Sequence, residues 1–179
     1  MIDYTKQINL SRKLSKVRQD LFKFLSGLAQ ETFDEAAMRW GILLIVGNFA
    51  PVSYKLDRYI GLGDSDISEH VVMYGTRAFK DAIKNFRNSD GAFVLDSASG
   101  QLLGNRVLYL DLKDDVSEEK GARHHAAASV SKDEGIDFAI TVSEETLTTR
   151  LYESGVVSES EDVKFPVEEG ETVEEDVSV

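Results

Sequence analysis

The chain has 179 residues, a formal net charge of −12 and 42% hydrophobic residues, a composition typical of one globular domain with appendages. The acidic balance argues against a general nucleic-acid-binding protein, because contact with phosphate backbones needs a surplus of Lys and Arg. The sequence has no cysteine, which excludes disulfides, thiolate zinc sites and cysteine nucleophiles. The N-terminus has no signal-peptide core, and the most apolar stretch, 41–52, is shorter than the roughly 20 residues that cross a bilayer. We therefore expect a cytoplasmic protein with neither a membrane nor a nucleic acid as partner.

Residues 5–30 are predicted to form an amphipathic helix. Its apolar stripe has spacings of three and four residues and consists of Leu10, Leu14, Val17, Leu21, Phe24 and Leu28. The stripe fits two interpretations, packing on the chain's own domain or contact with a partner subunit. At about three heptads it is short for a free-standing coiled coil.

The next segments predict a helix, a buried strand and a loop. In 31–40, Thr32 is a candidate N-cap with Glu35 three residues later, which is the pattern of a capping box. The run 41–47 is uniformly apolar and ends in glycine, which predicts a buried strand. Residues 48–70 are predicted to be a loop, because they contain the turn-forming segments AP and GLGDSD. Their glycines do not match a phosphate-binding pattern, which favours a surface turn.

The second half of the chain alternates helical and strand patterns. The predicted order is a helix at 75–89, strands at 90–96 and 102–112, a polar loop at 113–120, a helix that opens at 121, and strands at 135–143 and 146–155. From residue 157 onward nine acidic residues accompany one lysine, a composition that predicts a mobile tail. The alternation predicts an α/β (α+β) fold, with a central mixed β-sheet flanked by helices.

The segment GARHHAAAS, residues 121–129, carries the strongest chemical signal. Gly121 can adopt the backbone geometry that begins a helix, and the three alanines would let that helix lie close to the sheet. Arg123, His124 and His125 then fall in the first turn, where free N–H groups and the helix dipole favour an anion. Cations at this place are unfavourable unless an anion joins them, which indicates a phosphate site.

The same segment also has a structural interpretation. In it, one histidine is a hydrogen-bonded core residue and Arg123 pairs with an acid such as Glu119 or Asp137. A metal site that uses both histidines is disfavoured, because adjacent helical side chains point about 100° apart.

Two acidic motifs are further candidates. Asp90 lies between a predicted helix and a predicted strand, beside a glycine and an alanine, where it could hold magnesium or accept a hydroxyl proton. An ordinary turn aspartate fits the same Asp-Gly pair. Glu144 and Glu145 end a predicted strand, so one is expected to face the core side and the other solvent, although acids at a strand end are commonly just solvated.

Taken together, these motifs resemble the diadenylate cyclase domain, the nucleotide-binding domain first recognised at the N-terminus of the DNA integrity scanning protein DisA. The resemblance rests on DGA after a helix, GARHxAA about thirty residues on and VSEET about twenty further. It covers about 36–156 and is closest to soluble, archaeal-like members. The chain would then comprise an N-terminal amphipathic helix at 1–30, the cyclase domain at 31–156 and the acidic tail at 157–179.

The resemblance implies that two ATP molecules are condensed into cyclic di-AMP and two pyrophosphates, with Mg²⁺ or Mn²⁺, by two domains that meet face to face in a homo-oligomer. It implies that Asp90, Arg123 and His124 are catalytic, and that Asp90 and Glu145 bind the metal. The implied nucleotide-binding residues are Gly91, Ala92, Tyr109, Leu110, Gly121, Ala122, His125 and Ser143. His125 stands where the family commonly has arginine. The same residues fit a second hypothesis, a non-catalytic nucleotide-binding or sensing module of the same fold.

Overall fold

The structure is a computed structural model that describes residues 4–34, 40–49, 56–58, 72–88, 90–109, 111–114 and 121–164. The helices are α1 (Tyr4–Asp34), α2 (Arg77–Phe86) and α3 (Ala122–Val130). The strands are β1 (Ile42–Gly47), β2 (Leu56–Arg58), β3 (Val72–Met73), β4 (Ala92–Asp96), β5 (Gln101–Tyr109), β6 (Ile136–Val142), β7 (Thr149–Glu153) and β8 (Val156–Glu161).

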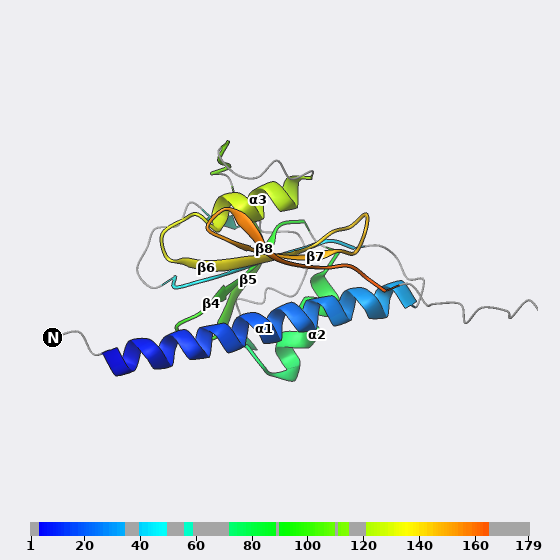
Figure 1. The fold of residues 1–179 in the computed structure, drawn as a ribbon. Helices are drawn as coiled ribbons and strands as arrows, with labels where there is room; N and C mark the ends of the chain where they lie inside the picture. The colour runs from blue at the N-terminus through cyan, green and yellow to red at the C-terminus, as the bar shows by residue number, and fades with distance from the viewer. Residues whose placement is uncertain are drawn as a thin grey trace, which may run out of the picture.

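One mixed sheet organises the molecule, in the order β2-β5-β4-β1-β6-β7-β8, with β3 also paired to β5. The central pair β1–β4 is parallel, whereas the two strands next to this pair, β5 and β6, run antiparallel to it. Helices α1 and α2 cover one face of the sheet and α3 covers the other (Figure 1). The predicted α/β (α+β) class with a central mixed sheet is confirmed.

Strand β1 supplies both layers of the core. All six of its residues are buried, as its uniformly apolar sequence predicts. Successive side chains point to opposite faces, so Leu44 packs in the cluster with α1 and α2, and Leu43 and Ile45 pack in the cluster with α3. In α3, Ala127 and Ala128 are fully buried, which confirms that the alanine run lets this helix lie close to the sheet.

Helix α1 runs through the predicted boundary at residue 30 without a break. Thr32 is therefore not an N-cap: its hydroxyl donates to the Leu28 carbonyl at 2.9 Å and accepts from Trp40 Nε1 at 2.7 Å. The prediction of a separate helix at 31–40 is wrong for residues 31–34, which continue α1. Residues 35–39 lie outside the described part of the chain.

The apolar stripe of α1 packs on the chain's own domain over its second half. Leu21, Leu25 and Leu28 are buried in the larger core cluster, and Leu14 and Val17 pack against it. The side chain of Leu10 lies outside the described residues.

The sheet extends further toward the C-terminus than the composition suggested. Strand β8 pairs antiparallel with β7, so the last strand does not lie within 146–155 and the tail does not begin at 157. An edge strand needs only backbone hydrogen bonds on one side, and β8 turns its acidic side chains to solvent. After β8, the Gln30 side chain bonds both backbone groups of Lys164, at 2.7 and 3.1 Å. Residues 165–179 lie outside the described part of the chain.

The prediction of a loop at 48–70 is wrong at 56–58, which form strand β2, and a second short strand, β3, follows the predicted loop. Strand β2 pairs with the end of β5, and β3 pairs with its beginning. Runs of two or three residues are too short to show a strand periodicity, which explains why the pattern did not indicate them.

Candidate functional site

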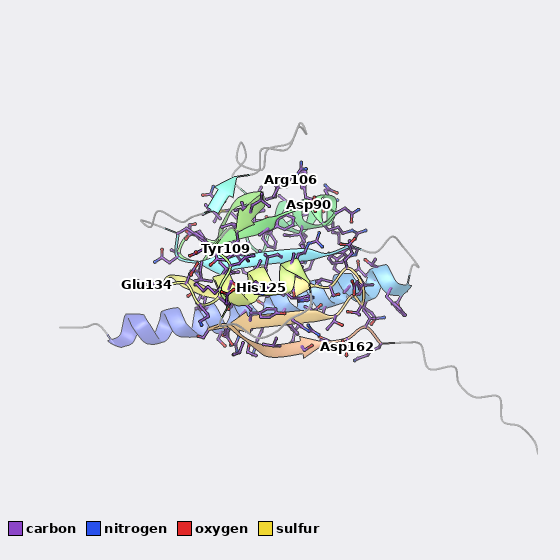
Figure 2. All side chains as sticks on the ribbon, turned by 90° about the horizontal axis from the view of Figure 1, so that it is seen from above. Asp90, Arg106, Tyr109, His125, Glu134 and Asp162 are labelled. Carbon is purple, nitrogen blue, oxygen red and sulfur yellow. The ribbon has the colours of Figure 1, made fainter. Side chains whose placement is uncertain are left out.

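A cavity of about 1090 Å³ opens at the edge of the sheet where β4 begins and β5 and β6 end. Ten of the twelve residues that the resemblance assigns to the site line it: Asp90, Gly91, Ala92, Tyr109, Gly121, Ala122, Arg123, His124, Ser143 and Glu145. Leu110 lies outside the described residues, and His125 is half-buried on α3 but is not part of the cavity wall. Figure 2 looks down on α3, with His125 labelled on this helix and Asp90 and Asp162 on opposite sides of it.

A tight backbone contact positions Asp90. Gly91 has φ +91°, and a Cβ at this position would come within 2.6 Å of the carbonyl carbon of Arg106 on β5. Arg106 itself has φ +61°, and the β4–β5 register shifts between Ala92 and Val94. Only glycine fits this conformation without strain, so the chain turns sharply into β4 and leaves the Asp90 side chain 91% exposed at the rim of the cavity.

Arg123 lies between two carboxylates. Its Nη1 donates to Glu144 Oε2 at 2.9 Å, and its Nη2 lies 3.8 Å from Asp90 Oδ1. The ion pair foreseen as an alternative therefore exists, but with Glu144 as the partner, whereas Glu119 lies outside the described residues. The Glu144 side chain is 59% exposed, and a pair of this kind contributes about 0–1 kcal/mol to stability. An anion that enters the cavity can therefore replace Glu144 at little cost.

The N-terminus of α3 opens into the same cavity. Gly121 precedes the helix with φ +103° and has no side chain to cap the first-turn N–H groups. His124 follows in that turn and is 8% exposed. Its Nδ1 lies 2.8 Å from the Tyr152 hydroxyl and 3.0 Å from Thr141 Oγ1. His124 is thus both a hydrogen-bonded core residue and part of the cavity wall.

An apolar wall faces these polar groups. Among the described residues, the exposed large hydrophobic side chains are Leu108, Leu112 and Val156, and the first two line the cavity. Tyr109 lies between them in the sequence and donates from its hydroxyl to Asp133 Oδ2 at 2.9 Å. Burial, together with the bond to Asp133, raises the pKa of Tyr109, so this hydroxyl stays protonated. Exposed apolar side chains within a concave site commonly contact the flat or apolar part of a ligand.

The turn after β6 carries the remaining acids. Strand β6 ends at Val142, and the turn is closed by Ser143 N bonding the Thr148 carbonyl at 2.9 Å. Glu144 and Glu145 are both exposed on this turn, and both line the cavity, so the expected division between core side and solvent is wrong. Glu144 belongs to an acidic motif that the sequence offered as a candidate, but the resemblance assigned only Glu145 to the metal, and the pairing of Glu144 with Arg123 was not predicted.

The carboxylates suit a hard divalent cation. Asp90, Glu144 and Glu145 present oxygen ligands to one cavity, and Mg²⁺ commonly uses one or two protein carboxylates together with phosphate oxygens of its substrate. In the described ranges, no three His, Asp or Glu side chains form a cluster that would cage a metal by themselves. The donor set therefore fits a cation that is shared between the protein and a bound phosphate compound.

Comparisons with known proteins identify the family of the chain. The family described as DisA bacterial checkpoint controller nucleotide-binding matches residues 34–157. A diadenylate cyclase of Methanocaldococcus jannaschii is 36% identical over 80 residues, which are 44% of this chain and 25% of that protein. The match thus spans a quarter of the length of that relative.

Two solved structures are similar in shape at low sequence identity. A double cysteine mutant of DacA from Staphylococcus aureus is 21% identical with a TM-score of 0.49, and the match covers 86% of this chain and 90% of that one. A hypothetical membrane spanning protein from Bacillus cereus is 19% identical with a TM-score of 0.47, over 80% of this chain and 61% of that one. In the described part of this chain, no helix combines the length and apolar character needed to cross a membrane. Because the family match covers more than half of the sequence, the chain belongs to the DisA bacterial checkpoint controller nucleotide-binding (DAC) family.

Proposed function

We propose that the chain is a diadenylate cyclase that condenses two ATP molecules into cyclic di-AMP and releases two pyrophosphates. The observation that carries this proposal is the joining of three features in one cavity: an uncapped helix N-terminus with Arg123, the carboxylates of Asp90 and Glu145, and an apolar wall. A nucleoside triphosphate needs each of them, for its phosphates, its metal and its base.

The proposed reaction is a nucleotidyl transfer carried out twice. The 3′-hydroxyl oxygen of one ATP bonds to the α-phosphorus of the other, the bond from that phosphorus to the β-phosphate oxygen breaks, and pyrophosphate leaves with the electron pair. Asp90 accepts the hydroxyl proton. Arg123 and the free N–H groups of α3 face the phosphates and stabilise the charge that develops on them. The second transfer closes the ring.

Asp90 and Glu145 would hold Mg²⁺ or Mn²⁺ together with phosphate oxygens of ATP. Bound there, the cation would neutralise phosphate charge and make the 3′-hydroxyl more acidic. Arg123 Nη2 lies 3.8 Å from Asp90 Oδ1, so the proposed phosphate-binding and metal-binding groups are neighbours in the cavity.

The reaction requires two ATP molecules to face each other, and the described residues of one chain form one such cavity. We therefore propose that two domains meet face to face in a homo-oligomer. The 91% exposed Asp90 side chain lies at the rim of the cavity, where it can reach a hydroxyl on ATP bound by the opposing domain. Cytoplasmic localisation, with no nucleic acid as partner, is part of the same proposal.

The alternative is a non-catalytic nucleotide-binding module, which is favoured by histidine at position 125 in place of the common arginine. Incubating the purified chain with ATP and Mn²⁺ or Mg²⁺, followed by chromatographic detection of cyclic di-AMP, separates the two. Asp90→Asn should abolish product while ATP binding and the thermal unfolding midpoint stay close to those of the wild type. ATP binding without product under either metal would favour the alternative, and full activity of Asp90→Asn would refute the role of Asp90.

A further inference from the structure

Two buried hydroxyl groups converge on one nitrogen of His124. Thr141 on β6 and Tyr152 on β7 are both fully buried, and their oxygens lie 3.0 and 2.8 Å from His124 Nδ1. The opposite edge of the ring faces the start of the helix, since a Cβ at Gly121 would have His124 Cδ2 as its nearest neighbour at 3.6 Å. One edge of the imidazole is therefore held by the sheet, and the other is turned toward the mouth of the cavity.

Hydrogen-bond accounting decides which nitrogen carries the proton. A neutral imidazole has one N–H donor and one acceptor nitrogen, and a buried hydroxyl that finds no acceptor costs about 1–3 kcal/mol. Within the described part of the chain, His124 Nδ1 is the hydrogen-bond partner of the Thr141 hydroxyl. If Nδ1 carried a proton, the Thr141 hydroxyl hydrogen would have no acceptor there. The hydrogen bond from the Thr141 hydroxyl therefore assigns Nδ1 as the acceptor nitrogen.

We propose that Thr141 and Tyr152 are positioning residues that hold His124 in the tautomer with its proton on Nε2. In this form the lone pair of His124 lies on Nδ1, against the sheet, and its N–H lies on the ring edge that faces the start of α3. This step rests on the proposed function: the N–H donates to a phosphate oxygen of bound ATP. The other tautomer would turn a lone pair toward the phosphate instead. Neither positioning residue lines the cavity, so both act through His124.

Nitrogen NMR tests the tautomer without reference to activity. The chain contains three histidines, so ¹⁵N-histidine labelling gives few signals, and His70→Gln and His125→Gln variants assign the remaining one. We expect His124 Nδ1 to resonate as an unprotonated, pyridine-type nitrogen and Nε2 as a protonated, pyrrole-type nitrogen. The reverse pattern in the wild-type protein would overturn the inference, whatever the activity.

Matched variants test the consequence. Thr141→Val removes the hydroxyl at nearly constant volume, and we expect mixed tautomers. Because only the fraction with its proton on Nε2 can donate to the phosphate, kcat/KM should fall by the inverse of that fraction, about 2-fold for equal populations. Thr141→Ser restores a hydroxyl and should restore both the spectrum and most of the activity. Tyr152→Phe should behave like Thr141→Val, whereas Tyr74→Phe, which removes a hydroxyl bonded to Asp20 on the opposite face of the sheet, should change neither.

The outcomes separate this inference from the proposed function. An unchanged His124 spectrum and unchanged product formation in Thr141→Val would overturn the inference. A wild-type protein with the expected spectrum that makes no cyclic di-AMP would support the assigned tautomer and refute the cyclase function.

Discussion

Gly41 offers a direct test of whether the position of Arg123 matters. Gly41 does not have a positive φ, so alanine is compatible with its backbone. A Cβ there would lie 2.6 Å from Arg123 Nη1, 3.1 Å from its Cζ and 3.2 Å from Glu144 Cβ. Since comfortable contacts begin at about 3.5 Å, the guanidinium group must move by about 0.9 Å. This group is the end of a flexible side chain, so the movement costs the fold little.

We expect Gly41→Ala to lower kcat/KM for cyclic di-AMP formation by about 10- to 100-fold, because a misplacement of about 1 Å in a catalytic group can cost about 100-fold. The thermal unfolding midpoint should stay close to that of the wild type. Gly27→Ala is the matched control, since a Cβ there meets nothing within 4 Å and lies in α1; it should keep full activity and be stabilised by up to about 1 kcal/mol. Wild-type kinetics in Gly41→Ala would refute the reasoning.

Three further predictions concern the core, the pH dependence of stability and the phosphate side of the site. Leu25→Ala, at a fully buried position of α1, should lower the free energy of unfolding in urea by about 2–5 kcal/mol, and a loss below about 1 kcal/mol would contradict the packing of α1. Burial raises the pKa of Asp137; a hydrogen bond from Ser97 opposes this shift and the charge of Asp96 adds to it. The stability that this group contributes is therefore present at low pH and is lost as pH rises through its folded-state pKa. Asp137→Asn should therefore raise the unfolding midpoint at pH 7 but not at pH 3, and equal shifts at both would count against this account. Arg123→Ala should reduce product formation at least about 10-fold more than His125→Ala, because only Arg123 lines the cavity, and equal losses in a turnover assay would place His125 at the phosphates as well.

The elements that sequence predicts well are those whose signal is local. The uniformly apolar run of β1 and the glycine that opens α3 both behave as expected, because burial on two faces and a positive φ restrict composition strongly. The prediction that Thr32 is an N-cap was wrong, although the capping-box pattern is also a local signal. The hydroxyl of Thr32 instead accepts a hydrogen bond from Trp40, a contact that depends on the fold. The acids of β8 suggested a tail because backbone pairing with β7 leaves no trace in composition.

The site shows the same division. Asp90 and Arg123 could be found from motifs, since glycine and helix-start patterns surround them. The pairing of Glu144 with Arg123 could not, because it depends on where β6 stops and the next turn begins. Leu108 and Leu112 carry no motif at all, and only the folded chain shows that their exposed side chains line a cavity.

The part of the chain that matches the family is shorter than the part that folds as one unit, because α1 lies almost entirely outside the match. The family match begins at residue 34, where α1 ends, and stops at residue 157, just inside β8. A protein cut to those limits would leave the sheet face under Leu21, Phe22 and Leu25 bare and would remove most of an edge strand. Such a fragment would expose a continuous apolar surface to water and should self-associate or precipitate on expression. Useful truncations must therefore keep the second half of α1 and all of β8, even though most of both lies outside the matched segment.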